Sequence, residues 1–189
     1  MKNKSITVRE IALMGMLLGV LEAAKRALDL VPNVELVTLL LVIYTIYFGK
    51  RTYIIAFAFT ALEIFFWGPH VWVIMYLYVW PLLVTIVLLI RRRADHWHYC
   101  LLSAGYGFCF GALCSVPYLF IGGPRMLLSW WIAGIPYDLI HGISNFLLCL
   151  VLFRPLSNAC AYMQRVTGTW PEPRPDEHAS GSDPSEHGA

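Results

Sequence analysis

Three polar side chains that could do chemistry lie close together in an apolar part of the sequence. Residues 134–146 read GIPYDLIHGISNF and supply a carboxylate at Asp138, an imidazole at His141 and an amide at Asn145. At 100° per residue they occupy an arc of about 60° on one helix face. A charged side chain facing lipid near the bilayer centre costs at least about 2.5–3.5 kcal/mol, so such residues usually face a bundle interior or water. The stripe therefore indicates a binding site.

Each member of this stripe also has a structural interpretation. Pro136 suits the first turn of a helix, and Asp138 just after it could cap free N–H groups and oppose the helix dipole. Asn145 lies too far along for capping and could hydrogen-bond a neighbouring helix. Asp138 and His141 at i, i+3 could also share a metal ion, although the HExxH pattern of zinc proteases is missing.

The composition shows what surrounds these polar groups. Of 189 residues, 58% are hydrophobic and only 14% are charged, far from the average of soluble proteins. Residues 53–90 contain one acidic residue and no Lys or Arg, although soluble proteins cover themselves with such residues. A net charge of +2 is too small to indicate nucleic-acid binding, and the five cysteines include no CxxC pair. We therefore predict a membrane protein.

Six apolar segments must position the polar residues. They lie near residues 8–28, 34–49, 53–67, 70–90, 99–121 and 132–153, and crossing about 30 Å of hydrocarbon takes about 20 helical residues. The second and third are short and could form one re-entrant pair, but Lys50 and Arg51 favour an aqueous turn between them. We predict an all-α membrane protein with six transmembrane helices in residues 1–156, kinked at Pro81 and Pro117, and a disordered cytoplasmic tail in residues 157–189.

The distribution of cations predicts the orientation. With the N-terminus inside, only Lys25, Arg26 and Arg125 lie in the outer loops. The inner segments carry Lys2, Lys4, Arg9, Lys50, Arg51, Arg91, Arg92, Arg93 and Arg154. Because cytoplasmic loops carry the excess of Lys and Arg, both termini are predicted to be cytoplasmic. The first helix is expected to be retained, since Glu22 spoils a signal-peptide cleavage pattern.

With this orientation, further polar and aromatic residues fall on the same outer side as Asp138 and His141. The segment FFWGPHVWVIMYLYVW adds many rings around the turn between the third and fourth segments, which would suit a ring-containing organic ligand. Lys25 and Arg26 could instead pair only with Glu22 and Asp29 on their own helix. The candidate substrate-binding residues are Glu22, Lys25, Arg26, Glu35, Glu63, Trp67, His70, Trp72, Tyr76, Asp138, His141 and Asn145.

Two stripes of small residues predict close helix packing. The first helix has Gly15, Gly19 and Ala23 at four-residue spacing with Ala12 adjoining, and the fifth segment has Ser103, Gly107, Gly111 and Ser115. Small residues let helix backbones approach closely within a membrane. Each stripe could pack inside the bundle or receive a helix of a partner protein.

These features together resemble the S components of energy-coupling factor (ECF) transporters. The similarity spans residues 6–156 and is carried by IALMGMLLGVLEAAK, VPNVELVTLLLVIY and WWIAGIPYDLIHGISNFLLCLVLFRPL. The resemblance implies a multi-pass protein of the bacterial cytoplasmic membrane that captures a vitamin or similar micronutrient in an outward-facing pocket. It also implies association with a transmembrane T protein and two cytoplasmic ATPases, since the chain has no Walker A motif of its own.

The resemblance further assigns partner docking to the first helix. The family's AxxxA pattern has its nearest matches here at Ala12xxxMet16 and Gly15xxxGly19, so Ala12, Gly15 and Gly19 are the docking candidates. Metal-transporting relatives depend on a histidine at the extreme N-terminus, which MKNK lacks, so we expect no metal and no cofactor. Two alternatives stay open: an intramembrane enzyme that uses Glu63, Asp138 and His141 for acid/base or metal chemistry, and a membrane scaffold subunit that neither transports nor catalyses.

Overall fold

The described part of the protein is built from helices. The computed structural model describes residues 6–28, 31 and 34–168, and no strand occurs within these ranges. The elements are α1 (Val8–Leu28), α2 (Val37–Phe48), the short 3-10 helix η1 (Gly49–Arg51), α3 (Thr52–Trp67), α4 (Val71–Ile90), α5 (His96–Phe108) and α6 (Phe110–Thr167). The predicted all-α class is confirmed.

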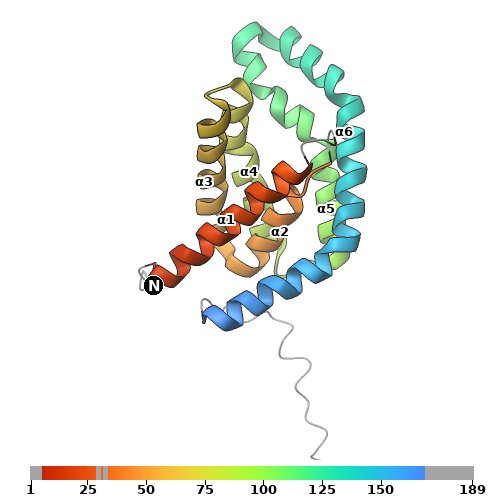
Figure 1. Ribbon diagram of the computed structural model, residues 1–189. Coiled ribbons are helices and arrows are strands. Elements are labelled where there is room, and N and C mark those ends of the chain that lie inside the picture. Colours follow the sequence, from red (N-terminus) through yellow and green to blue (C-terminus); the bar gives the residue numbers. More distant parts are fainter. Residues whose placement is uncertain (1–5, 29–30, 32–33, 169–189) are drawn as a thin grey trace, which may run out of the picture.

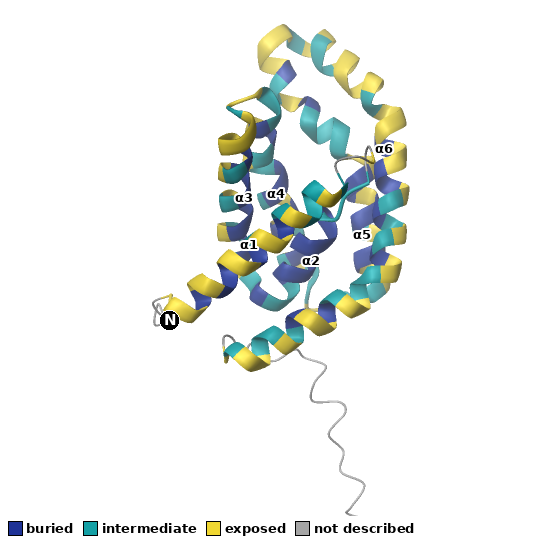
Figure 2. Ribbon diagram, viewed as in Figure 1, coloured by how far each residue is buried: buried dark blue, intermediate teal, exposed yellow. Residues whose placement is uncertain are grey.

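Helix α2 forms the centre of the bundle. Figure 1 shows α3 and α4 on one side of it, α5 and α6 on the other, and α1 crossing it obliquely. Every residue from Val37 to Thr45 is buried, as the dark colour of α2 in Figure 2 shows. A helix that is apolar all round belongs in an interior. Thus α2, short for an independent span, is enclosed by the other helices.

Three stretches of the described helices are long and apolar enough to cross a membrane: Val37–Trp67, Val71–Ile90 and His96–Thr167. Many large apolar side chains on the outside of the bundle are exposed, among them Phe120, Leu89 and Val151. Both observations fit a membrane protein, in which lipid covers such side chains. The count of six transmembrane helices and the orientation of the termini stay predictions.

The fifth and sixth predicted segments meet at a glycine pair. Within α6, Gly122 and Gly123 leave the helical conformation, and Gly123 has φ 75°, which an L side chain rarely adopts. Pro124 follows directly and starts the next helical stretch. The chain therefore reverses here, and Figure 1 shows the resulting arch at one end of the bundle.

The last helix is longer than the sequence predicted. It continues to Thr167, so residues 157–167 are helical and do not belong to the tail; residues 169–189 of the expected tail lie outside the described residues. Ser157 and Cys160 are buried, and the Gln164 side-chain amide donates a hydrogen bond to the carbonyl of Tyr47. A tertiary contact with the last turn of α2 therefore stabilises this stretch.

Pro117 shows how an apolar bundle satisfies a carbonyl that proline leaves without a partner. Proline has no N–H to donate to the residue four positions earlier, which here is Leu113. The hydroxyl of Tyr78 on α4 donates to the Leu113 carbonyl instead, at 2.6 Å. The carbonyl that Pro117 leaves without a helical partner thus accepts a hydrogen bond that links α6 to α4.

The second stripe of small residues, which runs from the end of α5 into the start of α6, packs inside the molecule. A Cβ added at Gly107 would lie 2.8 Å from the Gly142 backbone, and one added at Gly111 would lie 2.5 Å from the carboxylate of Asp138. Only glycine permits this approach of two helix backbones. Of the two interpretations of this stripe, the structure supports intramolecular packing.

Candidate functional site

A buried carboxylate on α3 joins α1 to the bundle. The side chain of Glu63 is fully buried, and one of its oxygens is paired with the ammonium of Lys25. Arg26 reaches its other oxygen at 3.3 Å and also pairs with Glu22 at 2.7 Å, one turn away. Both cations lie in the last turn of α1, where the helix dipole favours positive charge. The predicted pairing of Arg26 with Glu22 is present, whereas Lys25 reaches a different helix; Asp29 lies outside the described residues.

Aromatic rings surround both cations of this cluster. The Lys25 ammonium lies 5.9, 5.5 and 5.9 Å from the ring centroids of Phe59, Trp72 and Tyr76. These distances fall within the range of cation–π attraction. The guanidinium of Arg26 lies 4.9 Å from the ring of Phe66 and 5.1 Å from that of Trp67.

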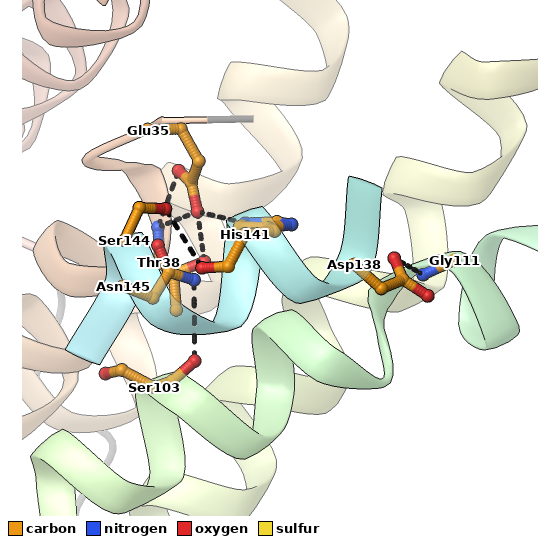
Figure 3. A network of polar contacts seen from close by, with 8 residues as sticks. All are labelled: Glu35, Thr38, Ser103, Gly111, Asp138, His141, Ser144 and Asn145. Atoms are coloured by element: carbon orange, nitrogen blue, oxygen red, sulfur yellow. Dashed lines mark hydrogen bonds and ion pairs between the residues drawn. The ribbon is translucent and has the colours of Figure 1, made fainter. Parts of the chain in front are cut away.

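A second polar cluster joins α2 to α6, as Figure 3 shows. Nε2 of His141 lies 3.0 Å from Oε1 of Glu35, across 106 residues of sequence. The backbone N–H of Thr38 donates to the same carboxylate at 3.0 Å, and its hydroxyl donates as well. Glu35 thereby satisfies one of the free N–H groups at the start of α2.

The other two members of the predicted stripe bind backbone groups. Asn145 donates to the carbonyl of Ser103, at the outer limit of hydrogen-bond distance, 3.4 Å. Oδ1 of Asp138 accepts the N–H of Gly111 at 2.8 Å, so it serves the first turn of α6, which precedes the break at Gly122 and Gly123, while Asp138 itself follows that break (Figure 3). The alternative interpretation, in which Asp138 caps a helix starting at Pro136, does not hold, because α6 already runs through Pro136. Oδ2 of Asp138 is buried and has no hydrogen-bond partner among the residues that the structure describes.

Three aromatic rings connect the two clusters. The ring of Tyr76, which lies beside Lys25, contacts that of Trp80 at 5.2 Å between centroids. Trp80 contacts Phe110 at 5.6 Å, and Phe110 packs edge-on against the imidazole of His141 at 4.8 Å. The two clusters therefore lie at the ends of one continuous aromatic wall.

Some of these residues were missed by sequence reasoning. Trp80 lies one helical turn after Tyr76 in the aromatic segment, so the spacing could have identified it. Phe59, Phe110 and Thr38 carry no comparable signal, since each is an ordinary residue of an apolar helix.

The remaining candidates lie at the edges of the clusters. His70 is exposed and stacks on Trp72 at 6.4 Å. Ala12, Gly15 and Gly19 are exposed on the outer face of α1, away from both clusters, and a Cβ added at Gly15 or Gly19 would meet nothing within 4 Å. The predicted substrate-binding residues thus form three groups. The first comprises the two polar clusters, and the second the aromatic residues around them. The third comprises Asp138 and Asn145, which bind backbone groups.

The donor set favours hydrogen bonding over metal binding. Among the described residues, no group of three or more His, Cys, Asp or Glu side chains is arranged to hold a metal ion. Each cluster instead combines a carboxylate, a cationic or imidazole group and aromatic rings. Such groups can orient a polar organic molecule through hydrogen bonds and stacking.

Comparisons of the chain with protein-family models, with curated proteins and with solved structures find no match.

Proposed function

We propose that the chain is the substrate-binding S component of an ECF-type transporter in the bacterial cytoplasmic membrane. It captures a vitamin or related micronutrient in an outward-facing pocket with six transmembrane helices around it and both termini in the cytoplasm. A T protein and two ATPases supply the energy, since the sequence has no Walker A motif. The chain itself catalyses no reaction.

The observation that carries this proposal is the pairing of two carboxylates, Glu63 and Glu35, with Lys25 and Arg26 and with His141 respectively. Glu63 binds the last turn of α1, and Glu35 lies two residues before the start of α2, so both carboxylates lie near the connection between these helices. Buried ionisable groups are costly in a membrane protein and mark functional sites by default. Their connection by Tyr76, Trp80 and Phe110 supports a ligand that has both polar groups and a ring.

The face of α1 that points away from the bundle suits the expected partner. Gly15 and Gly19 lie on it with open space around them, unlike Gly107 of α5 and Gly111 of α6. A helix of the T protein could approach this face closely.

Affinity purification from the native membrane tests the proposal. We expect a tagged chain to carry with it one polytopic membrane protein and two ATPases, and the complex to hydrolyse ATP. Recovery of the chain without any ATPase, and with no bound organic molecule, would contradict the proposal and favour the scaffold alternative. Stoichiometric zinc in the purified protein would favour the enzyme.

A further inference from the structure

The ammonium of Lys25 occupies a cage that the rest of the chain builds. The cage consists of the rings of Phe59, Trp72 and Tyr76 and the carboxylate of Glu63. All four come from α3 and α4, whereas Lys25 comes from α1. Three rings above one carboxylate form the arrangement that binds organic ammonium ions in proteins.

The two sides of this contact differ in burial. Glu63 is fully buried, and Phe59 is as well. The Lys25 side chain is 17% exposed and reaches the carboxylate on a flexible four-carbon stem. The carboxylate and the ring of Phe59 are therefore fixed in the interior of the bundle, Trp72 and Tyr76 are half-buried beside them, and the cation is the part that can move out.

The charges around the cage leave room for one exchangeable cation. Among the described residues, two acidic residues, Glu22 and Glu63, and two basic residues, Lys25 and Arg26, form the cluster, so its formal charge is zero. If the ammonium of Lys25 leaves, the remaining groups carry one negative charge. A monovalent cation entering the cage restores neutrality, whereas an anion would double the imbalance.

Arg26 is held differently from Lys25. Its guanidinium pairs with Glu22 on its own helix and lies over the rings of Phe66 and Trp67, outside the three-ring cage. It can therefore remain beside Glu63 and partly neutralise it while Lys25 is displaced. Lys25 is the tethered occupant.

We propose that the three-ring cage over Glu63 binds an organic cation, and that Lys25 occupies the cage only until such a ligand displaces it. This inference names the ligand class of the proposed S component and rests on that function. The ligand carries a quaternary ammonium, a protonated amine or a cationic ring that enters between Phe59, Trp72 and Tyr76.

Choline is a suitable probe, with uncharged 3,3-dimethylbutan-1-ol as its isostere. We expect the purified chain to bind choline and not the isostere, as measured by calorimetry. In Lys25→Met the tethered competitor is gone, so choline should bind at least about fivefold more tightly, because the competent state is then fully populated. Glu63→Gln should weaken binding at least about tenfold, and Lys50→Met, a control in η1, should not change it. Weaker or unchanged binding in Lys25→Met, or no choline binding in either protein, would overturn the proposal.

A second measurement uses the unaltered chain, so it does not depend on the folding of a variant. Lys25 should react slowly with acetic anhydride while it lies in the cage, and choline should raise its acetylation at least about twofold, as followed by mass spectrometry. Lys50 serves as the internal reference. Bound choline that leaves the acetylation of Lys25 unchanged would contradict displacement.

The inference and the proposed function fail in different ways. A chain that co-purifies with the ATPases but binds no organic cation remains a transporter subunit and refutes the cage. A chain that binds choline without any ATPase partner keeps the cage and refutes the transporter assignment.

Discussion

At the scale of single residues, the pair of Glu35 and His141 connects parts of the chain that are 106 residues apart. Both side chains were singled out from the sequence because ionisable groups are unexpected in apolar segments. Their pairing could not be predicted, since helical periodicity gives the face on which a residue lies but not the helix that it meets. The same holds for Lys25, whose partner lies on α3 instead of on its own helix.

Replacing His141 should cost stability. In His141→Ala the carboxylate of Glu35 loses its imidazole partner and Phe110 loses a packing contact, so we expect the free energy of unfolding to fall by about 1–3 kcal/mol. Thermal unfolding in detergent measures this. His70→Ala is the matched control, because His70 is exposed and only stacks on Trp72. Equal effects of the two substitutions would show that the pair contributes nothing.

Asp95 gives a pH-dependent prediction outside the membrane-spanning segments. It caps α5 by accepting the N–H of His98, and its hydrogen bond with the His98 side chain lowers the pKa of the carboxyl from its ordinary value of 3.8. A lowered pKa stabilises the folded state above about pH 4, and this contribution is lost as the pH falls through the folded-state pKa. We expect hydrogen-exchange protection of the first turn of α5 to decrease only below pH 4. In Asp95→Ala, protection should already be reduced at neutral pH; unchanged protection would refute the cap.

At the scale of elements, the sequence predicted the first four helices well and the end of the last helix poorly. Apolar runs located α1 to α4 to within a few residues, since lipid-facing and buried helices both need continuous apolar sequence. The stretch of residues 157–167 was missed because its helical state depends on burial of Ser157 and Cys160 and on the bond from Gln164 to Tyr47. Those are tertiary contacts, which composition does not show.

The close contact of α5 with α6 requires a residue without a side chain at position 107. In Gly107→Ala, the added Cβ would lie 2.8 Å from the Gly142 backbone, so the helices must separate, at a cost of about 1–3 kcal/mol. Gly105→Ala is the control on the same helix, because a Cβ there meets nothing within 4 Å. It should leave stability unchanged or raise it by up to about 1 kcal/mol. Thermal unfolding of both variants checks this, and a Gly107→Ala protein as stable as the unaltered chain would contradict the described packing.

At the scale of the whole molecule, charge pairs hold α1 against the bundle near both ends. Glu10 pairs with Arg51 of η1 near its start, and Lys25 pairs with Glu63 near its end. Between them, Leu13, Leu17 and Leu21 face the core, and Gly15 and Gly19 face outward. The sequence revealed the small-residue stripe, but only the fold distinguishes this open stripe from the packed one at the junction of α5 and α6.

Because the small-residue stripe on α1 is open, a substitution there should affect binding of the proposed T protein without affecting the stability of the chain. Gly19→Leu adds a side chain where nothing lies within 4 Å, so the chain should keep its unfolding temperature but lose co-purification with the proposed T protein. Gly105→Leu makes the same change at an open position on α5 and should keep the partner. Quantitative mass spectrometry of the affinity-purified material compares them. Retention of the partner in Gly19→Leu would place docking elsewhere.

Native mass spectrometry of the purified chain tests the central claim most directly, because it detects any bound molecule by the mass that it adds to the chain. We predict one small organic molecule on each chain, absent from Glu35→Gln and Glu63→Gln. It should be retained in Glu10→Gln, which alters the carboxylate that pairs with an arginine near the other end of α1. A chain without a bound molecule, or one that retains it equally in all three variants, would contradict a binding site at the two charge clusters.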